Sequence, residues 1–144
     1  MRIKIILTAL FFPMLFISLI ASPGYCQATD KAFEELRSEL KSEEVSDEFI
    51  KVTGSSVKRM IACAAPTADI KTVLLDLWTQ KVKGRALKNA VAAVAELVAS
   101  GDNVLEASSI ASGAAHKAEA EGLSGFGVGM RVKKAVQDRK AYLK

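Results

Sequence analysis

Beyond residue 30, apolar residues recur at steps of three and four along almost the whole chain, which is the spacing of one face of an α-helix. The first stripe consists of Phe33, Leu36 and Leu40 and lies on an otherwise charged segment. No segment alternates apolar and polar residues in the way that a half-buried β-strand does. The pattern therefore predicts helices and no sheet.

The middle of the chain carries the densest apolar pattern. A second segment covers residues 46–64 and ends before Pro66, because proline disfavours the helical conformation of the residue that precedes it. Gly54 weakens this segment, and we expect a kink or a split there. The third segment begins at Thr67, which we expect to cap it. Its stripe, the most continuous in the chain, ends in the only tryptophan, which we expect to anchor the core: Ile70, Val73, Leu74, Leu77 and Trp78.

Glycines separate the remaining segments. Gly84 precedes the fourth segment, Gly101 closes it as a helix cap, and Gly122 ends the fifth. The fifth segment begins at Asn103, three residues before Glu106, which is the spacing of a capping box. Apart from alanine, serine and glycine, its inner face can offer only Val104, Leu105 and Ile110. Small residues bury little area, so this helix is stable only where neighbouring helices approach it closely; the alternative is a marginal element.

Together these segments predict an all-α fold, a single small helical bundle of about five to six helices over residues 29–144. No low-complexity tract or long linker divides the chain. We expect the third and fourth helices to form the most stable unit, because they carry the densest stripes of large apolar residues.

The N-terminus has the composition of a secretory signal. Arg2 and Lys4 precede an apolar, uncharged run over residues 5–21, and small residues follow it. We predict a signal peptide over residues 1–28, with cleavage after Ala28. An uncleaved membrane anchor is the alternative, although the run is short for a membrane span. The protein is then exported, into the periplasm or out of the cell.

The position of the cut decides which cysteines remain. Cleavage after Gly24 is the second choice, and it retains both Cys26 and Cys63, which can pair in an oxidising compartment. A lipid-modified Cys26 is a further alternative, but Tyr25 before it is not the small residue that such sites need. We expect Cys63, which lies among apolar residues, to be a small buried hydrophobe rather than a reactive thiol.

Charge is unevenly distributed in the predicted mature chain. Loss of Arg2 and Lys4 leaves 18 of the 20 Lys and Arg against all 16 Asp and Glu, a net charge of +2. Residues 30–48 are rich in acid and include Glu34, Glu35, Glu39, Glu43, Glu44, Asp47 and Glu48. Residues 123–144 hold one acid, Asp138, and six cations, Arg131, Lys133, Lys134, Arg139, Lys140 and Lys144. The two ends can attract each other or bind two different partners.

Four glycines lie within eight residues ahead of the basic C-terminal segment, at positions 122, 125, 127 and 129. Their order is neither that of a dinucleotide-binding loop nor that of a P-loop, and no strand precedes them. One interpretation is a contact site for an anion or a charged surface, formed by backbone N–H groups and nearby cations. Its residues would be Gly125, Gly127, Gly129, Arg131, Lys133 and Lys134.

Two other interpretations of the glycine-rich stretch remain open. The favoured one is a flexible connector, in which Phe126, Val128 and Met130 pack back onto the bundle. The other is membrane contact, because the stretch is apolar and is followed by a basic amphipathic helix. Under the favoured interpretation, binding to anionic surfaces is at most weak and sensitive to salt.

The sequence offers little catalytic or metal-binding chemistry. His116 is the only histidine, and one imidazole with scattered carboxylates is not a zinc site. We predict no catalytic, cofactor-binding or metal-binding residues and no cofactor. Nucleic acid is not expected as a partner, because the basic helix has a single aromatic residue, Tyr142, and the protein is predicted to be exported.

These observations favour a non-catalytic interaction protein of the periplasm or cell envelope, with a protein partner that the sequence does not identify. The alternative is a surface-active protein that contacts anionic lipid or polysaccharide through the glycine-rich loop and the basic helix. The third hypothesis is an enzyme whose active site we do not recognise.

Overall fold

The computed structural model describes residues 23–144, which form six α-helices and no strand, as the apolar pattern predicts. The helices are α1 (Pro23–Ser42), α2 (Asp47–Ala62), α3 (Thr67–Thr79), α4 (Gly84–Ala99), α5 (Val104–Ala120) and α6 (Gly125–Tyr142). Most of the predicted signal peptide lies outside the described residues. Both predicted cleavage positions fall within the first two turns of α1, so either cut would shorten this helix and retain its apolar stripe.

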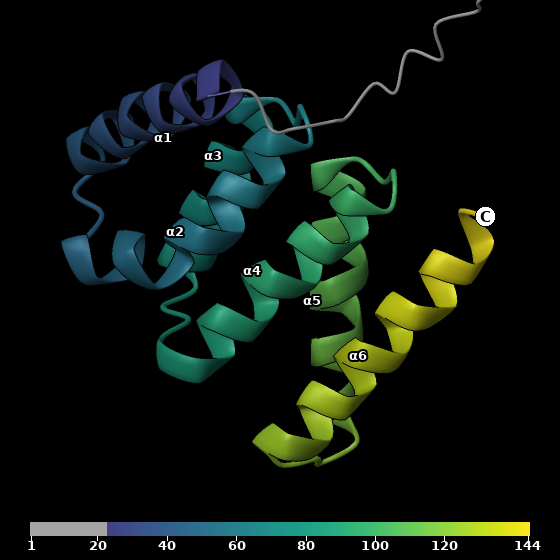
Figure 1. The fold of residues 1–144 in the computed structure, drawn as a ribbon. Helices are drawn as coiled ribbons and strands as arrows, with labels where there is room; N and C mark the ends of the chain where they lie inside the picture. The colour runs from purple at the N-terminus through teal and green to yellow at the C-terminus, as the bar shows by residue number, and fades with distance from the viewer. Residues whose placement is uncertain (1–22) are drawn as a thin grey trace, which may run out of the picture.

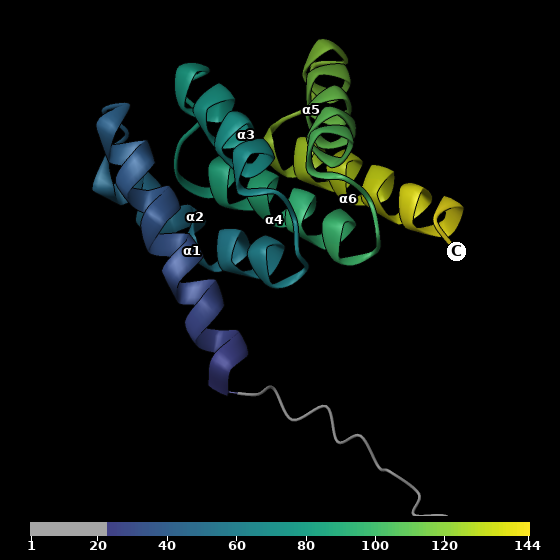
Figure 2. The ribbon, with the colours of Figure 1, turned by 90° about the horizontal axis from the view of Figure 1, so that it is seen from above.

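The helices form a bundle in which α4 lies at the centre (Figure 1). This helix packs against α2, α5 and α6, whereas α3 packs against α1, α2 and α5. The acidic α1 and the basic α6 lie on opposite sides of the molecule in both views (Figures 1 and 2). The expectation that the acidic and basic ends of the chain attract each other is therefore wrong.

Large apolar side chains from the first four helices form most of the core. Its largest fully buried members include Val57, Met60, Ile70, Leu74, Leu87, Val91, Val94 and Leu97. Trp78 lies at the edge of this core, where it meets the ring of Phe49 edge to face with the ring centroids 5.4 Å apart. It packs against the core as expected but is only partly buried, and its contact with Phe49 has a geometry that is favourable for an aromatic pair.

Gly54 does not split α2, which is continuous from Asp47 to Ala62. The glycine is buried beneath the aromatic ring of Phe33 on α1. A Cβ atom at this position would lie 3.3 Å from Cζ of Phe33, closer than ordinary van der Waals contact. The missing side chain therefore lets α1 pack closely on α2, and this contact offsets the low helix propensity of glycine.

The predicted boundaries of α5 are correct. The side-chain oxygen of Asn103 accepts a hydrogen bond of 2.8 Å from the backbone N–H of Glu106, as an N-cap does. Gly101 and Gly122 have φ angles of +101° and +75°, in the left-handed region that glycine adopts without strain. Thr67 is not a cap, since Pro66 takes the N-cap position and Thr67 is the first helical residue of α3.

The small residues of α5 face its neighbours as expected. Ala107, Ala111 and Ala118 are buried, and α5 packs against α3, α4 and α6. Leu105 does not belong to this inner face, because its side chain remains 48% exposed. Val104 occupies the inward position, and the next residue of a helix points about 100° away from it. The helix thus buries alanine where other helices bury leucine.

Candidate functional site: the outer face of α6

The glycine-rich stretch is not a loop. Gly125, Gly127 and Gly129 lie in the first turns of α6, and the connection from α5 is only four residues long, 121–124. The helical hydrogen bonds begin at once, since the N–H of Val128 donates to the carbonyl of Ser124 at 2.9 Å. Gly127 allows a close contact, because a Cβ atom there would lie 3.1 Å from Cβ of Leu123. The flexible connector that we favoured from the sequence is therefore wrong.

Two large apolar residues of this stretch face solvent. The side chains of Phe126 and Met130 are 82% and 54% exposed, so the expectation that they pack onto the bundle is wrong. Val128 is partly buried and does turn inward. The reason is helical periodicity: Val128, Val132 and Val136 recur every four residues on the inner face, and Phe126 and Met130 lie on the other side.

Leu123 joins these two residues from the turn before α6. Its side chain is 37% exposed and lies against the first turn of the helix at Gly127. We call Leu123, Phe126 and Met130 the apolar tip. Among the residues that the structure describes, the large apolar side chains that are exposed number five, and three of them form this tip. The other two, Leu105 and Tyr142, lie on α5 and at the far end of α6.

The three cations beside the apolar tip differ in their partners. The guanidinium of Arg131 lies 2.6 Å from the carboxylate of Glu121 and ties α6 to the end of α5. Lys133 and Lys134 are exposed and form no ion pair or side-chain hydrogen bond within residues 23–144. We call Lys133 and Lys134 the lysine pair. Their charges are therefore free to act on something outside the fold.

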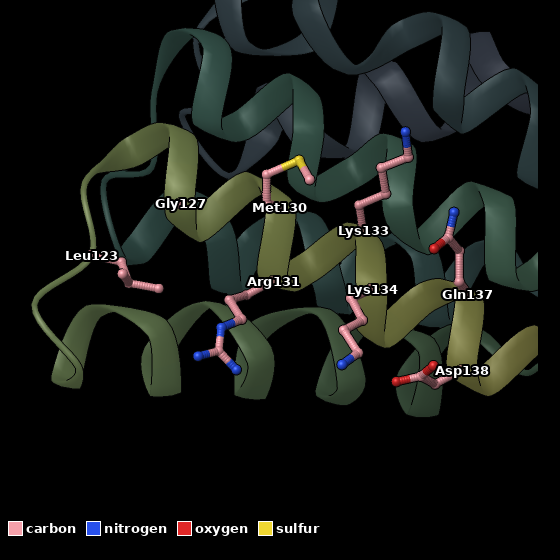
Figure 3. A pocket seen from close by; sticks show the side chains of 8 residues that line it. All are labelled: Leu123, Gly127, Met130, Arg131, Lys133, Lys134, Gln137 and Asp138. Carbon is pink, nitrogen blue, oxygen red and sulfur yellow. The ribbon is translucent and has the colours of Figure 1, made fainter.

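Two members of the apolar tip, Leu123 and Met130, and the three cations border one shallow groove of about 670 Å³ (Figure 3). It is lined by Leu123, Gly127, Met130, Arg131, Lys133, Lys134, Gln137 and Asp138. Figure 3 shows Met130, Lys133 and Gln137 along one edge of the helix and Arg131, Lys134 and Asp138 along the other. All lining residues come from α6 and the turn before it, so the groove is a surface depression that is open to solvent.

The inner face of α6 carries a buried ion pair that sequence analysis missed. Asp102 precedes α5, and only 3% of its side chain is exposed. Arg139 donates to both of its carboxylate oxygens, from Nε at 2.8 Å and from a terminal nitrogen at 3.1 Å. These hydrogen bonds hold the pKa of Asp102 below its ordinary value, although burial of the carboxylate acts in the opposite direction. A second acid, Glu106, lies 2.8 Å from the same guanidinium.

One feature of the sequence indicates that Arg139 needs a buried acidic partner. Arg139 follows Val132 and Val136 at helical spacing, so it had to share their inward face. An arginine on the buried face of a helix needs a carboxylate partner, because burying an unpaired charge is very costly. Sequence spacing could not show which of the 16 acids supplies that carboxylate. The fold brings in Asp102 from 37 residues away.

Three of the six cations in residues 123–144 form ion pairs within the fold. Arg131, Arg139 and Lys140 all form ion pairs, with acids of α4 or of the turns on either side of α5. The acidic residues of α1 and α2 pair with cations of their own region, for example Asp47 with Lys41 at 2.8 Å between Nζ and Oδ1. Within the C-terminal segment, the cations left without an acid partner in the described chain are the lysine pair and Lys144, and of these the lysine pair lies beside the apolar tip.

The remaining candidates for chemistry lie on separate surfaces. Cys63 ends α2 and is exposed, so the expectation of a small buried hydrophobe is wrong. Cys26 is also exposed, and no disulfide joins the two thiols. His116 is exposed on α5, with Nδ1 3.8 Å from the carboxylate of Glu119. Within residues 23–144, no three His, Cys, Asp or Glu side chains gather closely enough to hold a metal ion.

None of the six described helices combines the length and the apolar character that crossing a membrane requires. No protein-family model matches this sequence, and comparisons with curated proteins and with solved structures return no significant match.

Proposed function

We propose that this chain is an exported helical protein that acts by non-catalytic binding at the cell envelope, and that the first half of α6 is its contact surface. The observation that carries the proposal is the apolar tip: Phe126 and Met130 are exposed one turn apart on α6, and Leu123 is exposed in the turn that precedes the helix. Single exposed apolar residues are ordinary, but a contiguous patch marks an interaction site in soluble proteins. Export rests on the composition of the first 28 residues.

The scaffold supports this proposal because it fixes the apolar tip in place. Arg131 holds the start of α6 through Glu121, and Arg139 holds its end through Asp102. A partner therefore meets a preformed surface, and little conformational entropy is lost on binding. Covering a large apolar side chain such as Phe126 contributes about 1.5–3 kcal/mol when it is fully buried. Leu123 and Met130 are already partly covered within the fold, so each adds less than Phe126 does.

Binding rather than catalysis is proposed because the polar groups that chemistry requires are dispersed. Cys63 and His116 lie on different helices, and no hydrogen bond between them occurs in the described chain. A nucleophile needs a base within hydrogen-bonding reach. The groove beside α6 offers lysine, arginine and a single carboxylate, that of Asp138, and it is open to water. Such a surface suits recognition of charge and apolar area.

Site-specific photo-crosslinking in intact producing cells tests the proposal. A photoreactive phenylalanine analogue replaces Phe126 in one variant and Tyr142 in a matched control. Both positions are exposed aromatics on α6, 82% and 80% respectively, but they lie at opposite ends of the helix. We expect an adduct from position 126 and little from position 142. Equal labelling at both positions, or labelling at 142 alone, would contradict the proposed contact surface.

The export part of the proposal needs its own measurement. We expect the protein in the periplasmic or envelope fraction, with Thr29 as the N-terminal residue, or Tyr25 if the second cleavage position is used. N-terminal sequencing of protein from fractionated cells makes this check. Recovery from the cytoplasm with an intact N-terminus would contradict it.

A further inference from the structure

We infer that the occupant of this surface is the headgroup layer of an anionic phospholipid bilayer, which α6 enters with its apolar tip first. The inference rests on the proposed function and names the partner of the same surface. Leu123, Phe126 and Met130 would lie below the lipid phosphates, and the lysine pair would lie beside them. An apolar tip flanked by cations is the chemistry of proteins that bind membrane surfaces without spanning them.

The spacing along α6 fits the dimensions of this layer. Lys133 follows Phe126 by seven positions, which corresponds to about 10 Å along a helix that rises 1.5 Å per residue. Interfacial helices bury their apolar residues about 5–10 Å into the boundary between headgroups and acyl chains. When Phe126 reaches this boundary, the ammonium groups of the lysine pair are therefore level with the phosphates. The four-carbon stems of the lysines supply further reach.

The start of α6 is also accessible to a flat surface. The connection between α5 and α6 forms the lower edge of the molecule in Figure 1, and α1 lies at the opposite edge. A bilayer that covers this lower edge meets the apolar tip without contact with the acidic α1. Asp138 is the only acid that lines the groove, and it is three turns from Phe126.

The free charge is complementary to an anionic surface. Lys133 and Lys134 are the cations of the groove that pair with no acid in the described chain, whereas Arg131 is held by Glu121. A lysine at an anionic bilayer raises the partition constant by about fivefold at moderate salt. The lysine pair together accounts for about 25-fold, and this contribution falls as salt screens the charges.

Other occupants fit the surface less well. A second copy, docked symmetrically, would place the lysine pair of one chain near its own counterpart, because a twofold interface uses the same patch on both subunits. An anionic polysaccharide or polyphosphate matches the lysines but provides no apolar phase for Phe126 and Met130. A lipid bilayer satisfies both parts of the surface at once.

Vesicle co-sedimentation with the mature protein, purified from the exporting cell, tests the inference. One set of vesicles contains equal parts of phosphatidylglycerol and phosphatidylcholine, and the other contains phosphatidylcholine alone. We expect sedimentation with the anionic vesicles at 0.05 M salt, weaker binding at 0.5 M salt, and little binding to phosphatidylcholine. Equal binding to both vesicles, or none to either, would overturn the inference.

Two double variants separate the apolar and ionic contributions. Phe126→Ser with Met130→Ser should weaken binding to anionic vesicles about tenfold or more, since the apolar contacts are lost. Lys133→Gln with Lys134→Gln should weaken it about 25-fold at low salt and much less at high salt. The control, Tyr142→Ser with Lys144→Gln, removes an exposed aromatic and a cation from the other end of the segment and should change binding less than twofold.

Each alternative occupant has a distinct outcome. Suppose that polyphosphate abolishes binding to anionic vesicles and that this binding survives the loss of Phe126 and Met130. The protein is then attracted to anions in general, and the lipid inference is overturned. Self-association in gel filtration that only the apolar variant removes indicates a second copy and also overturns it. If vesicles do not bind but position 126 still crosslinks specifically to a protein in cells, the inference fails and the proposed function stands. If position 126 captures nothing and vesicles do not bind, both fail.

Discussion

The first four helices and the last two are stabilised by different means. In α1–α4, large side chains such as Val57, Leu74 and Leu97 are almost fully buried. In α5 the buried residues are Val104 and three alanines, and in α6 Val136 alone is buried. The α6 helix packs on α5 and α4, and ion pairs of Arg131, Arg139 and Lys140 with acids of its neighbours add to this packing.

This difference accompanies the candidate surface on α6. The free energy gained by apolar burial is proportional to the buried area, so α1–α4 gain most of their stability from residues that must face inward. On α6 only Val136 is fully buried, and Val128 and Val132 are partly buried on the same face. Phe126 and Met130 lie on the outer face, where they remain exposed. The following five changes are arranged from the largest expected effect to the smallest.

Leu74→Ala should have the largest effect on stability. Leu74 is completely buried on α3, and truncation of such a leucine lowers the free energy of unfolding by about 2–5 kcal/mol. Leu105→Ala is the matched control, because this leucine is about half exposed. Urea unfolding followed by circular dichroism makes the comparison. Equal losses in the two variants would show that burial does not distinguish the two regions.

Asp102→Ala should be the most damaging single change in the α5–α6 region. Removing one partner of a buried ion pair leaves the other uncompensated. Since the remaining partner keeps some contact with water and with Glu106, we expect a loss of about 2–3 kcal/mol in the free energy of unfolding. Asp138→Ala, which removes an exposed acid of α6, is the control. A loss below about 0.5 kcal/mol for Asp102→Ala would contradict the role of the ion pair.

Ala111→Leu tests the close approach of helices to α5. Ala111 is buried, and protein interiors are close-packed, so a larger side chain should not fit there without displacing its neighbours. Overpacking of this kind costs about 1–3 kcal/mol. Ala120→Leu, at the exposed end of the same helix, should be nearly neutral. A neutral Ala111→Leu would indicate a loosely packed α5, and thermal unfolding of both variants decides this.

The pH dependence of stability isolates the charge on Asp102. Its pKa is held below the ordinary value of 3.8, so the unfolded chain binds the proton more tightly than the folded chain does. The stability that this carboxylate contributes is fully present above about pH 4 and is lost as pH falls through the lowered pKa. Asp102→Asn, which cannot titrate, should therefore differ most from wild type near neutral pH. A difference that stays constant down to pH 2.5 would contradict this assignment.

Loss of the lysine pair should have the smallest effect on stability. Lys133→Gln with Lys134→Gln removes two exposed charges without partners in the described chain, so the free energy of unfolding should change by less than about 0.5 kcal/mol. A larger destabilisation would show that these lysines hold α6 in place, and they would then be unavailable to an external partner. Chemical denaturation of the double variant makes this check.

The sequence predicts the fold well where large apolar residues repeat. The stripe from Ile70 to Trp78 and the cap at Asn103 are local signals, and both are found in the structure. The candidate surface is predicted only in part. Its glycines and cations draw attention to this stretch, but the sequence indicates a loop, because glycine has low helix propensity and the hydrogen bond from Val128 to Ser124 is not visible in sequence.

The exposure of single side chains and the partners of ion pairs between distant residues were harder to predict. Phe126 was expected to be buried because it is apolar, but its orientation follows from the register of α6, which the inward-facing Val128 and Val136 set. The partner of Arg139 depends on a contact across 37 residues. Local pattern alone cannot supply such a contact.

Hydrogen exchange of the mature protein, with and without phosphatidylglycerol vesicles, tests most directly that the start of α6 is the binding surface. The first amides of a helix lack backbone partners and exchange rapidly, which makes residues 125–127 sensitive reporters. We expect slower exchange in peptides that cover residues 123–134 when vesicles are added, and unchanged exchange in α1 and α2. Unchanged exchange over residues 123–134, or protection that appears in α1 instead, would contradict the account.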